Sequence, residues 1–381
     1  MQILGILAFV VALLLSVMIH EFGHYLTAKH YGMKVSEFFL GFGTRIWSRQ
    51  RGETEFGVKA IPAGGYCRIE GMTPGDQMPA GEEGRAFYKA PSHRKLIVLG
   101  AGSFLHFVIG YLLLFTLFAA IGTSQVLPVV HEVLKGSAAQ SAGFMAGDEI
   151  TSINGKKVMD WYRDVKTIRN SHGQALIFGV NRAGQNLVIT ATPKLETVDG
   201  EKRFLLGVIN EVGLKRTGVL TSVKDAGIVT KSFLVESVKS LIKLPSKIPA
   251  LWGATVNGDK RDSNGLVGIV GVARVSGQTV GSGVLSPMER LATFILIIAS
   301  LNIFVGLFNL LPILPLDGGH MAVAIADEIR AFIARLRGRP RPAAIDVTVL
   351  TPITLVVFVI LAALTLLLLV ADIVNPVVLN L

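Results

Sequence analysis

Four long stretches without a charged side chain constrain this protein more than any other feature of its sequence. They cover residues 1–19, 96–122, 291–316 and 347–371. A helix needs about 20 apolar residues to cross the hydrocarbon core of a bilayer. These stretches alternate with segments of mixed polarity, which excludes a single soluble globule, and the 51% content of hydrophobic residues excludes a disordered chain. The pattern predicts a polytopic α-helical membrane protein with four transmembrane helices.

Basic residues predict the orientation of these helices. They concentrate in segments 32–95 and 321–346, whereas the start of the chain and the tail 373–381 contain no Lys or Arg. Loops rich in Lys and Arg remain on the cytoplasmic side of a membrane. We therefore expect both basic segments in the cytoplasm and the N- and C-termini outside it. This topology accounts for the net charge of +10, and no basic patch interleaved with aromatic residues indicates a nucleic-acid partner.

The same signals divide the chain into nine segments. The transmembrane helices are expected at residues 1–31, 96–122, 288–320 and 347–372. Cytoplasmic loops are expected at 32–95 and 321–346, and an extracytoplasmic tail at 373–381. The topology leaves residues 123–287 outside the cytoplasm, and we call them the outer region. It is expected to hold a β-rich domain over residues 123–197 and a connecting region over residues 198–287.

Local patterns support this reading of the outer region. Within the β-rich domain, turn signals at Asn154-Gly155 and Ala183-Gly184 separate short apolar runs, which lie at residues 128–130, 149–153, 175–180 and 187–190. One helix is expected at residues 161–170. In the connecting region, apolar residues at helical spacing predict an amphipathic helix over residues 222–251. The Gly- and Ser-rich segment 258–283 predicts a loop.

A metal-binding pattern lies at the inner end of the first apolar stretch. It reads His20-Glu21-Phe22-Gly23-His24. Residues four apart share one face of a helix, so both imidazoles can bind one metal ion while Glu21 reaches the attacking water. The alternative is a set of polar residues at the membrane boundary. A carboxylate facing lipid is costly, however, and Glu21 therefore needs a polar site.

A second polar pattern follows the third apolar stretch. It begins at Asn309 and ends at Leu316-Asp317-Gly318-Gly319-His320. Catalytic zinc takes three protein ligands and keeps one position open, and the first pattern supplies only two. Asp317 is the preferred third ligand, ahead of His320. The first and third spans run in the same direction, which brings Asp317 to the same face of the membrane as His20 and His24. Asn309 has two interpretations, which are holding the substrate carbonyl or oxyanion and hydrogen bonding between helices.

Together these patterns resemble the site-2 protease family of intramembrane zinc metalloproteases, in particular its bacterial members with an outer PDZ domain. The family pattern N-x-x-P-x-x-x-L-D-G is matched by Asn309, Pro312, Leu316, Asp317 and Gly318. The resemblance implies that Zn²⁺ is bound by His20, His24 and Asp317, and that Glu21 is the general base. It also implies a bacterial plasma membrane location and single-span substrates such as anti-sigma factors, cut in regulated intramembrane proteolysis.

Other segments are similar to parts of this family with less specificity. Residues 56–66 resemble its membrane-associated β-hairpin, with a turn at Gly64-Gly65 and an edge on which an unwound substrate could pair. Residues 142–155 are similar to its PDZ domains, which implies a groove for a peptide or a substrate ectodomain.

Two residues lie outside these matches. His106 stands where many relatives have Asn, and either a hydrogen-bonding or a packing role fits it. Cys67 is the only cysteine, so we expect it to be structural.

Two other function classes are consistent with parts of the pattern. A metal transporter also carries His, Asp and Glu inside a membrane, but it would have polar residues through both leaflets, and here they gather at one depth. A catalytically inactive PDZ scaffold would not need Glu21 between two histidines. The sequence thus favours an intramembrane zinc metalloprotease acting on peptide bonds in or near transmembrane segments.

Overall fold

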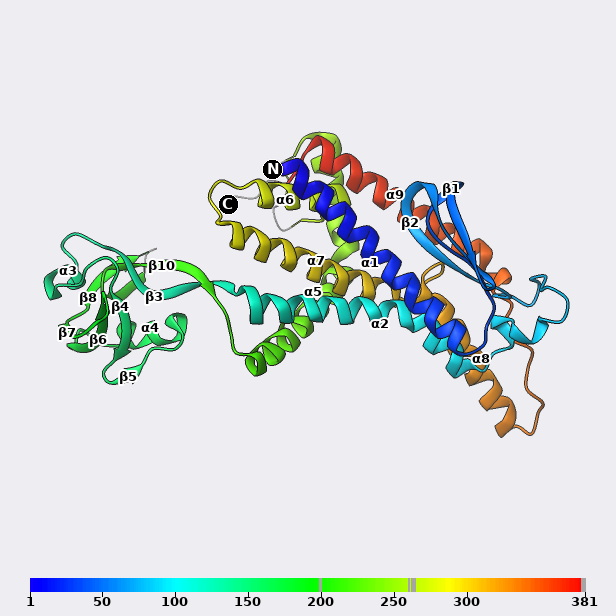
Figure 1. Cartoon of the computed structure of the whole chain (residues 1–381), viewed down its shortest axis with the longest axis horizontal. Coiled ribbons are helices and arrows are strands. Elements are labelled where there is room, and N and C mark those ends of the chain that lie inside the picture. Colours follow the sequence, from blue (N-terminus) through cyan, green and yellow to red (C-terminus); the bar gives the residue numbers. More distant parts are fainter. Residues whose placement is uncertain (199–200, 260, 262–264, 378–381) are drawn as a thin grey trace. The chain divides into compact units, whose positions relative to one another are not determined.

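The computed structural model describes residues 1–198, 201–259, 261 and 265–377. It divides into two compact units (Figure 1). The first unit combines Met1–Leu117 with Val219–Leu381, and the second is the inserted segment Phe118–Gly218.

The first unit is built on four helices that are long and apolar enough to cross a membrane, counted over the described residues. They are α1 (Gln2–His30), α2 (Ser92–Thr116, continued to Ile121), α7 (Pro287–Asn309) and α9 (Thr351–Val374, preceded by a short turn from Val347). Leu4, Leu7 and Leu15 of α1 are exposed, whereas Ser16 and His20 are buried. Apolar residues outside and polar residues inside suit a helix surrounded by lipid. The predicted four apolar helices are confirmed.

Two further helices lie in the segment expected as the connecting region, residues 198–287. The predicted amphipathic helix is present as α5 (Val219–Trp252), followed by a short helical turn, Gly253–Asn257. The loop predicted over residues 258–283 is wrong for its second half, because Ile269–Gly281 forms helix α6. Its small residues allow close packing on α1: a Cβ added to Gly277 would lie 2.9 Å from the Gln2 carbonyl oxygen. Small residues favour this kind of helix contact in membranes, so they indicate a helix here and not a loop.

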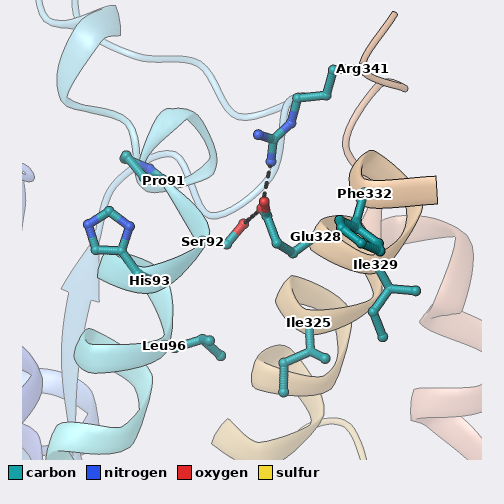
Figure 2. Close-up of a pocket in the computed structure, with 9 residues that line it drawn as sticks. All are labelled: Pro91, Ser92, His93, Leu96, Ile325, Glu328, Ile329, Phe332 and Arg341. Carbon is teal, nitrogen blue, oxygen red and sulfur yellow. Dashed lines mark hydrogen bonds and ion pairs between the residues drawn. The ribbon is translucent and has the colours of Figure 1, made fainter. Parts of the chain in front are cut away.

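The third membrane helix ends earlier than the sequence predicts. A capping box of Ser286 and Glu289 begins α7, which ends at Asn309 and not at residue 320. The prolines at 312 and 315 cannot donate the backbone hydrogen bonds of a continuing helix. A new helix, α8 (Asp317–Leu336), then occupies much of the segment predicted as a cytoplasmic loop. It lies beside the first turns of α2 (Figure 2).

A long β-hairpin connects α1 to α2. Its strands are β1 (Val35–Arg51) and β2 (Thr54–Ile69). The chain turns at Gly52, so the turn predicted at Gly64-Gly65 is wrong, and that dipeptide lies within β2. The first half of β1 pairs on one side with 65–69 and on the other with 55–58. Short helical turns at Glu83–Arg85 and Phe87–Lys89 lead from the hairpin into α2.

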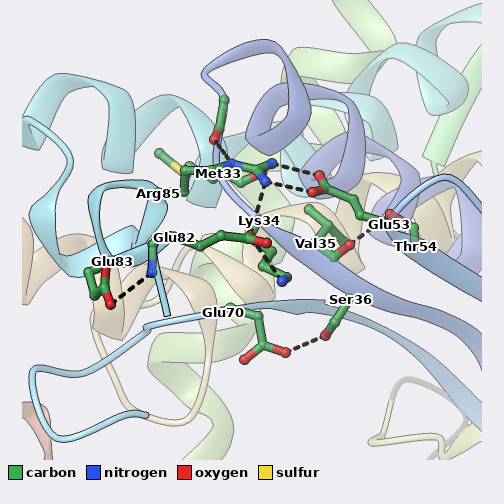
Figure 3. A network of polar contacts seen from close by, with 12 residues as sticks. Met33, Lys34, Val35, Ser36, Glu53, Thr54, Glu70, Glu82, Glu83 and Arg85 are labelled. Atoms are coloured by element: carbon green, nitrogen blue, oxygen red, sulfur yellow. Dashed lines mark hydrogen bonds and ion pairs between the residues drawn. The ribbon is translucent and has the colours of Figure 1, made fainter. Parts of the chain in front are cut away.

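Arg85 ties the hairpin to the end of α1 (Figure 3). Its guanidinium nitrogens Nη1 and Nη2 donate to the two carboxylate oxygens of Glu53 at 2.6 and 2.7 Å, and its Nε donates to the Gly32 carbonyl at 2.9 Å. Lys29, in the last turn of α1, also pairs with Glu53. A bidentate guanidinium–carboxylate pair fixes geometry as well as adding energy. The turn of the hairpin is therefore held at the C-terminal end of α1, the helix that carries His20 and His24.

This cluster predicts a pH-dependent contribution to stability. The hydrogen bonds from Arg85, helped by Lys29, lower the pKa of Glu53 to about 2 from its usual value near 4.5. A lowered carboxyl pKa stabilises the fold above the unfolded pKa, and this contribution is lost as the pH falls toward 2. We expect Glu53→Gln to lower Tm at pH 7, and the difference from the wild type to vanish near pH 2. A Tm difference that does not change with pH would contradict this role.

The second unit is a β-rich domain. Its main sheet has the strand order β10-β3-β4-β6-β7, with antiparallel neighbours. The strands are β3 (Thr123–Val133), β4 (Glu149–Ile153), β6 (Leu176–Arg182), β7 (Gln185–Ala191) and β10 (Val208–Lys215). β5 (Lys156–Lys157) pairs with β4, while β8 (Lys194–Val198) and β9 (Glu201–Leu205) form a separate hairpin. Because β10 belongs to the sheet, the unit extends beyond the predicted limit at residue 197.

The core of this unit explains its sequence pattern. Ile150, Phe178 and Val180 of the sheet pack with Trp161 and Ile168 of α4 (Trp161–Arg169). The predicted strands and this helix are confirmed.

One buried ion pair lies beside the short helix α3 (Ala138–Ala142). Asp148 accepts hydrogen bonds from Arg182 and from the Met145 amide. Burial opposes ionisation of this carboxyl, but the Arg182 guanidinium outweighs it and lowers the pKa of Asp148. Asp148, which lies within the segment 142–155, thus contributes to the folding of this unit.

Candidate metal centre

The two histidines of the first pattern meet on one face of α1. His20 and His24 are both buried, and their Nε2 atoms are 3.0 Å apart. The separation of four residues produces this directly, because it is close to one helical turn. Phe22, between them, faces outward and is exposed. The predicted pairing of the two imidazoles is therefore present in the fold.

Asp317 joins the histidines from a segment almost three hundred residues away. As the first residue of α8, it places Oδ2 at 3.1 Å from His20 Nε2 and at 3.3 Å from His24 Nε2. The ligand atoms all lie within 4.8 Å of one another. Gly318 permits this approach, since a Cβ there would lie 2.3 Å from the Leu310 carbonyl carbon. The break after α7 thus folds α8 back toward α1.

The three side chains fit a zinc ion. Tetrahedral zinc with ligands at about 2.0–2.1 Å separates the ligand atoms by roughly 3.3 Å. The separations observed here are 3.0, 3.1 and 3.3 Å. Two imidazoles and one carboxylate are also a donor set that catalytic zinc uses, with a fourth position left for water or substrate.

The orientation of His24 is fixed from α2. Its Nδ1 lies 2.8 Å from the Val98 carbonyl oxygen. A carbonyl can only accept, so Nδ1 carries the proton and the lone pair of Nε2 faces His20 and Asp317. Metal-binding histidines generally use their second nitrogen in this way.

Glycine allows α2 to approach the histidines closely. A Cβ added to Gly102 would lie 2.5 Å from His20 Cε1, and one added to Gly23 would lie 2.7 Å from the Ala101 carbonyl oxygen. Both distances are too short for any side chain. Gly102 and Gly23 therefore allow the wall of the site to form, a role that sequence reasoning did not assign.

A buried polar network adjoins His20, and it explains His106. His106 Nδ1 donates to Asn302 Oδ1 at 2.9 Å, and its ring centroid lies 5.0 Å from that of His20. Asn302 Nδ2 in turn donates to Ser16 Oγ at 3.1 Å and to the Ile298 carbonyl at 2.9 Å. The network joins α1, α2 and α7 inside the bundle. His106 thus holds two helices together through its bond to Asn302, which is the packing role of the two roles left open for it.

Replacing Asn302 should weaken this packing. In Asn302→Leu, His106 and Ser16 each lose a buried partner, and we expect the free energy of unfolding to fall by about 1–2 kcal/mol. Ser300→Ala is the matched control on the same helix. Over the residues that the structure describes, Ser300 Oγ bonds only to the Ile297 carbonyl within α7. Thermal unfolding in detergent measures both. An equal shift in the two variants would show that the network adds no stability.

The remaining predicted residues occupy different positions. Glu21 is half-buried beside the hairpin, where a Cβ on Gly65 would lie 3.5 Å from its Cγ. Asn309 is the half-buried last residue of α7, and its side chain makes no hydrogen bond within the described part of the chain. His320, one turn into α8, lies outside the metal-binding group found over the described residues. Neither Asn302 nor Val98 was predicted from the sequence.

Known proteins resemble this chain over almost its full length. A model described as Peptidase family M50 matches residues 8–358. The zinc metalloprotease Rip1 of Mycobacterium tuberculosis is 34% identical, with 99% of each chain covered. Rip1 of Mycolicibacterium smegmatis is 33% identical, with 98% of each chain covered. The matched region includes α1 and the start of α8, and hence the three residues of the metal-binding group.

Proposed function

This chain belongs to Peptidase family M50, the site-2 protease family of zinc metalloproteases, and we propose that His20, His24 and Asp317 bind its zinc while Glu21 is the general base. The observation that carries the proposal is the convergence of three ligand atoms within 4.8 Å, two of them from buried histidines and one from the half-buried Asp317. Two of them come from a membrane-spanning helix. An ion held there lies within the membrane protein and not in an exposed domain.

Each residue around the site has a separate role in peptide hydrolysis. Bound zinc supplies a Lewis acid that polarises a carbonyl and makes water more acidic. Glu21 accepts the proton of the attacking water and delivers it to the leaving amine. Val98 holds His24 in the required tautomer through its carbonyl. Asn309 holds the substrate carbonyl or the developing oxyanion, which is one of its two interpretations.

The hairpin provides a surface for an extended substrate. Segment 65–69 pairs with 35–40 on one side only, over the described residues, and Glu21 lies beside it at Gly65. A transmembrane helix keeps its carbonyls in hydrogen bonds, so it must unwind before it can be cut. An unwound segment that adds to this edge regains those bonds next to Glu21. The substrates of this protein are single-span membrane proteins such as anti-sigma factors, which it cuts in regulated intramembrane proteolysis.

The protein lies in a plasma membrane, and its second unit lies on the outer side. The basic segments 32–95 and 321–346 face the cytoplasm, which puts both termini on the outer side of a bacterial plasma membrane. The second unit is an extracytoplasmic PDZ domain, and its groove selects peptides or substrate ectodomains. When β10 is included, the limit of this domain moves from residue 197 to the boundary at Gly218. The connecting region, expected at residues 198–287, then begins at Val219.

The position of the cut tests this function. Purified protein is reconstituted with single-span substrates, and the products are identified by mass spectrometry. We expect cleavage in or next to the apolar segment, and faster cleavage when a helix-breaking Gly or Pro lies near the bond. Asn309→Ala should lower kcat by about 10²-fold with zinc retained if Asn309 stabilises the oxyanion. Zinc-loaded protein that cuts no substrate in the panel would favour the inactive scaffold.

A further inference from the structure

One face of α8 carries exposed apolar side chains. The buried face is made of small residues such as Ala324, Ala331 and Ala334. The opposite face presents larger residues, which are Ile325, Ile329, Phe332, Ile333 and Leu336, with exposures from 41% to 71%. Spacings of three and four residues put most of them in one stripe along the helix. Such a stripe is unusual on a surface that faces water.

The stripe continues into a groove between α8 and the start of α2 (Figure 2). This cavity of about 640 Å³ is lined by Leu96 on one side and by Ile325, Ile329 and Phe332 on the other. Its two charged side chains are paired with each other, because Glu328 accepts a hydrogen bond from Arg341 at 3.0 Å and a second one from Ser92 at 2.8 Å. The groove therefore suits an apolar chain better than a polar ligand.

Positive charge follows the apolar stripe along the sequence. Arg335, Arg337 and Arg339 are exposed. Their side chains form no hydrogen bond or ion pair with other residues that the structure describes. Apolar side chains next to unpaired arginines are typical of helices that lie in the interface of an anionic bilayer.

We propose that α8 and this groove bind the surface of the membrane through its anionic phospholipids. The acyl chains contact Ile325, Ile329 and Phe332, and the arginines that follow pair with lipid phosphates. The location supports this partner, since the groove opens at Ser92, where the second membrane-spanning helix begins. Each arginine near such a surface strengthens binding by roughly fivefold. Because α8 begins at Asp317, this contact also anchors the helix that carries that residue.

Fluorescence in proteoliposomes tests the proposal on the whole chain. Cys67→Ala removes the only cysteine, and Phe332→Cys then carries an environment-sensitive dye. The control is Tyr162→Cys, at a residue of the second unit that is 78% exposed. Vesicles contain phosphatidylcholine with or without phosphatidylglycerol. Spin-labelled lipids report contact with the bilayer. Iodide, present on both sides of the vesicle membrane, reports contact with water.

Phosphatidylglycerol should increase quenching of the Phe332 dye by spin-labelled lipid severalfold, while the Tyr162 dye stays accessible to iodide. Arg335→Gln, Arg337→Gln and Arg339→Gln combined should remove this increase, as should high salt. Three results would overturn the proposal. They are iodide access at Phe332 equal to that at Tyr162, lipid quenching that does not depend on phosphatidylglycerol, and protection from both quenchers. The last result would indicate that a second copy of the chain covers α8.

Discussion

Glu21→Gln is expected to lower kcat by about 10²- to 10⁴-fold while zinc stays bound. Glutamine keeps the shape of the side chain but cannot accept the proton of the attacking water at neutral pH. The three proposed metal ligands keep their positions, because His20, His24 and Asp317 contact one another directly and not by way of Glu21. Cleavage of a single-span substrate measures kcat, and zinc analysis of the same preparation measures the zinc content.

Asp327→Asn is the matched control for this loss. Asp327 is a carboxylate of α8 that pairs with Arg330 and with the Ile345 amide, away from the metal-binding group. Its replacement should leave kcat within about twofold of the wild type, in line with the small effects of most changes away from a site. If zinc-loaded Glu21→Gln cleaves as fast as this control, Glu21 is not the base.

Asp317→Ala is expected to remove both zinc and activity. The change leaves two imidazoles at a site that needs three protein ligands. Loss of a residue that merely supports a ligand already costs about 10- to 100-fold in metal affinity, so loss of the ligand itself should exceed 100-fold. Zinc content after dialysis against a weak chelator measures the effect, and substrate cleavage should fall in parallel.

His320→Ala distinguishes ligand from neighbour. His320 lies three residues further along the same helix and does not belong to the metal-binding group. We expect this variant to keep its zinc under the same dialysis. The opposite ranking, with zinc lost from His320→Ala and retained by Asp317→Ala, would mean that α8 presents a different ligand from the one proposed.

The sequence predicts those parts of the fold that rest on local pattern. Runs of apolar residues specify the four long helices because hydrocarbon excludes charge regardless of the rest of the fold. The spacing of His20 and His24 follows from helix geometry. Asp317 could be added because a zinc site lacks a third ligand without it, although its position at the start of a new helix depends on how Pro312 and Pro315 end α7.

The parts that were missed depend on contacts between distant segments. Asn302 is one amide within an apolar helix, and only the packing of α7 on α2 reveals its partner His106. The Gly-rich segment that forms α6 was predicted as a loop, because glycine disfavours helices in water. Packing against α1 reverses that preference. The hairpin turn was likewise placed at Gly64-Gly65, since Gly52 carries a weaker local signal.

X-ray absorption at the zinc edge of the purified wild-type protein tests the proposed centre most directly. We predict a ligand shell of two imidazole nitrogens with carboxylate and water oxygens, all at about 2.0–2.1 Å. Asp317→Ala should lose this signal with its zinc. A thiolate ligand at about 2.3 Å, for which Cys67 is the only cysteine of the sequence, or a third imidazole in place of the carboxylate, would contradict a site made of His20, His24 and Asp317.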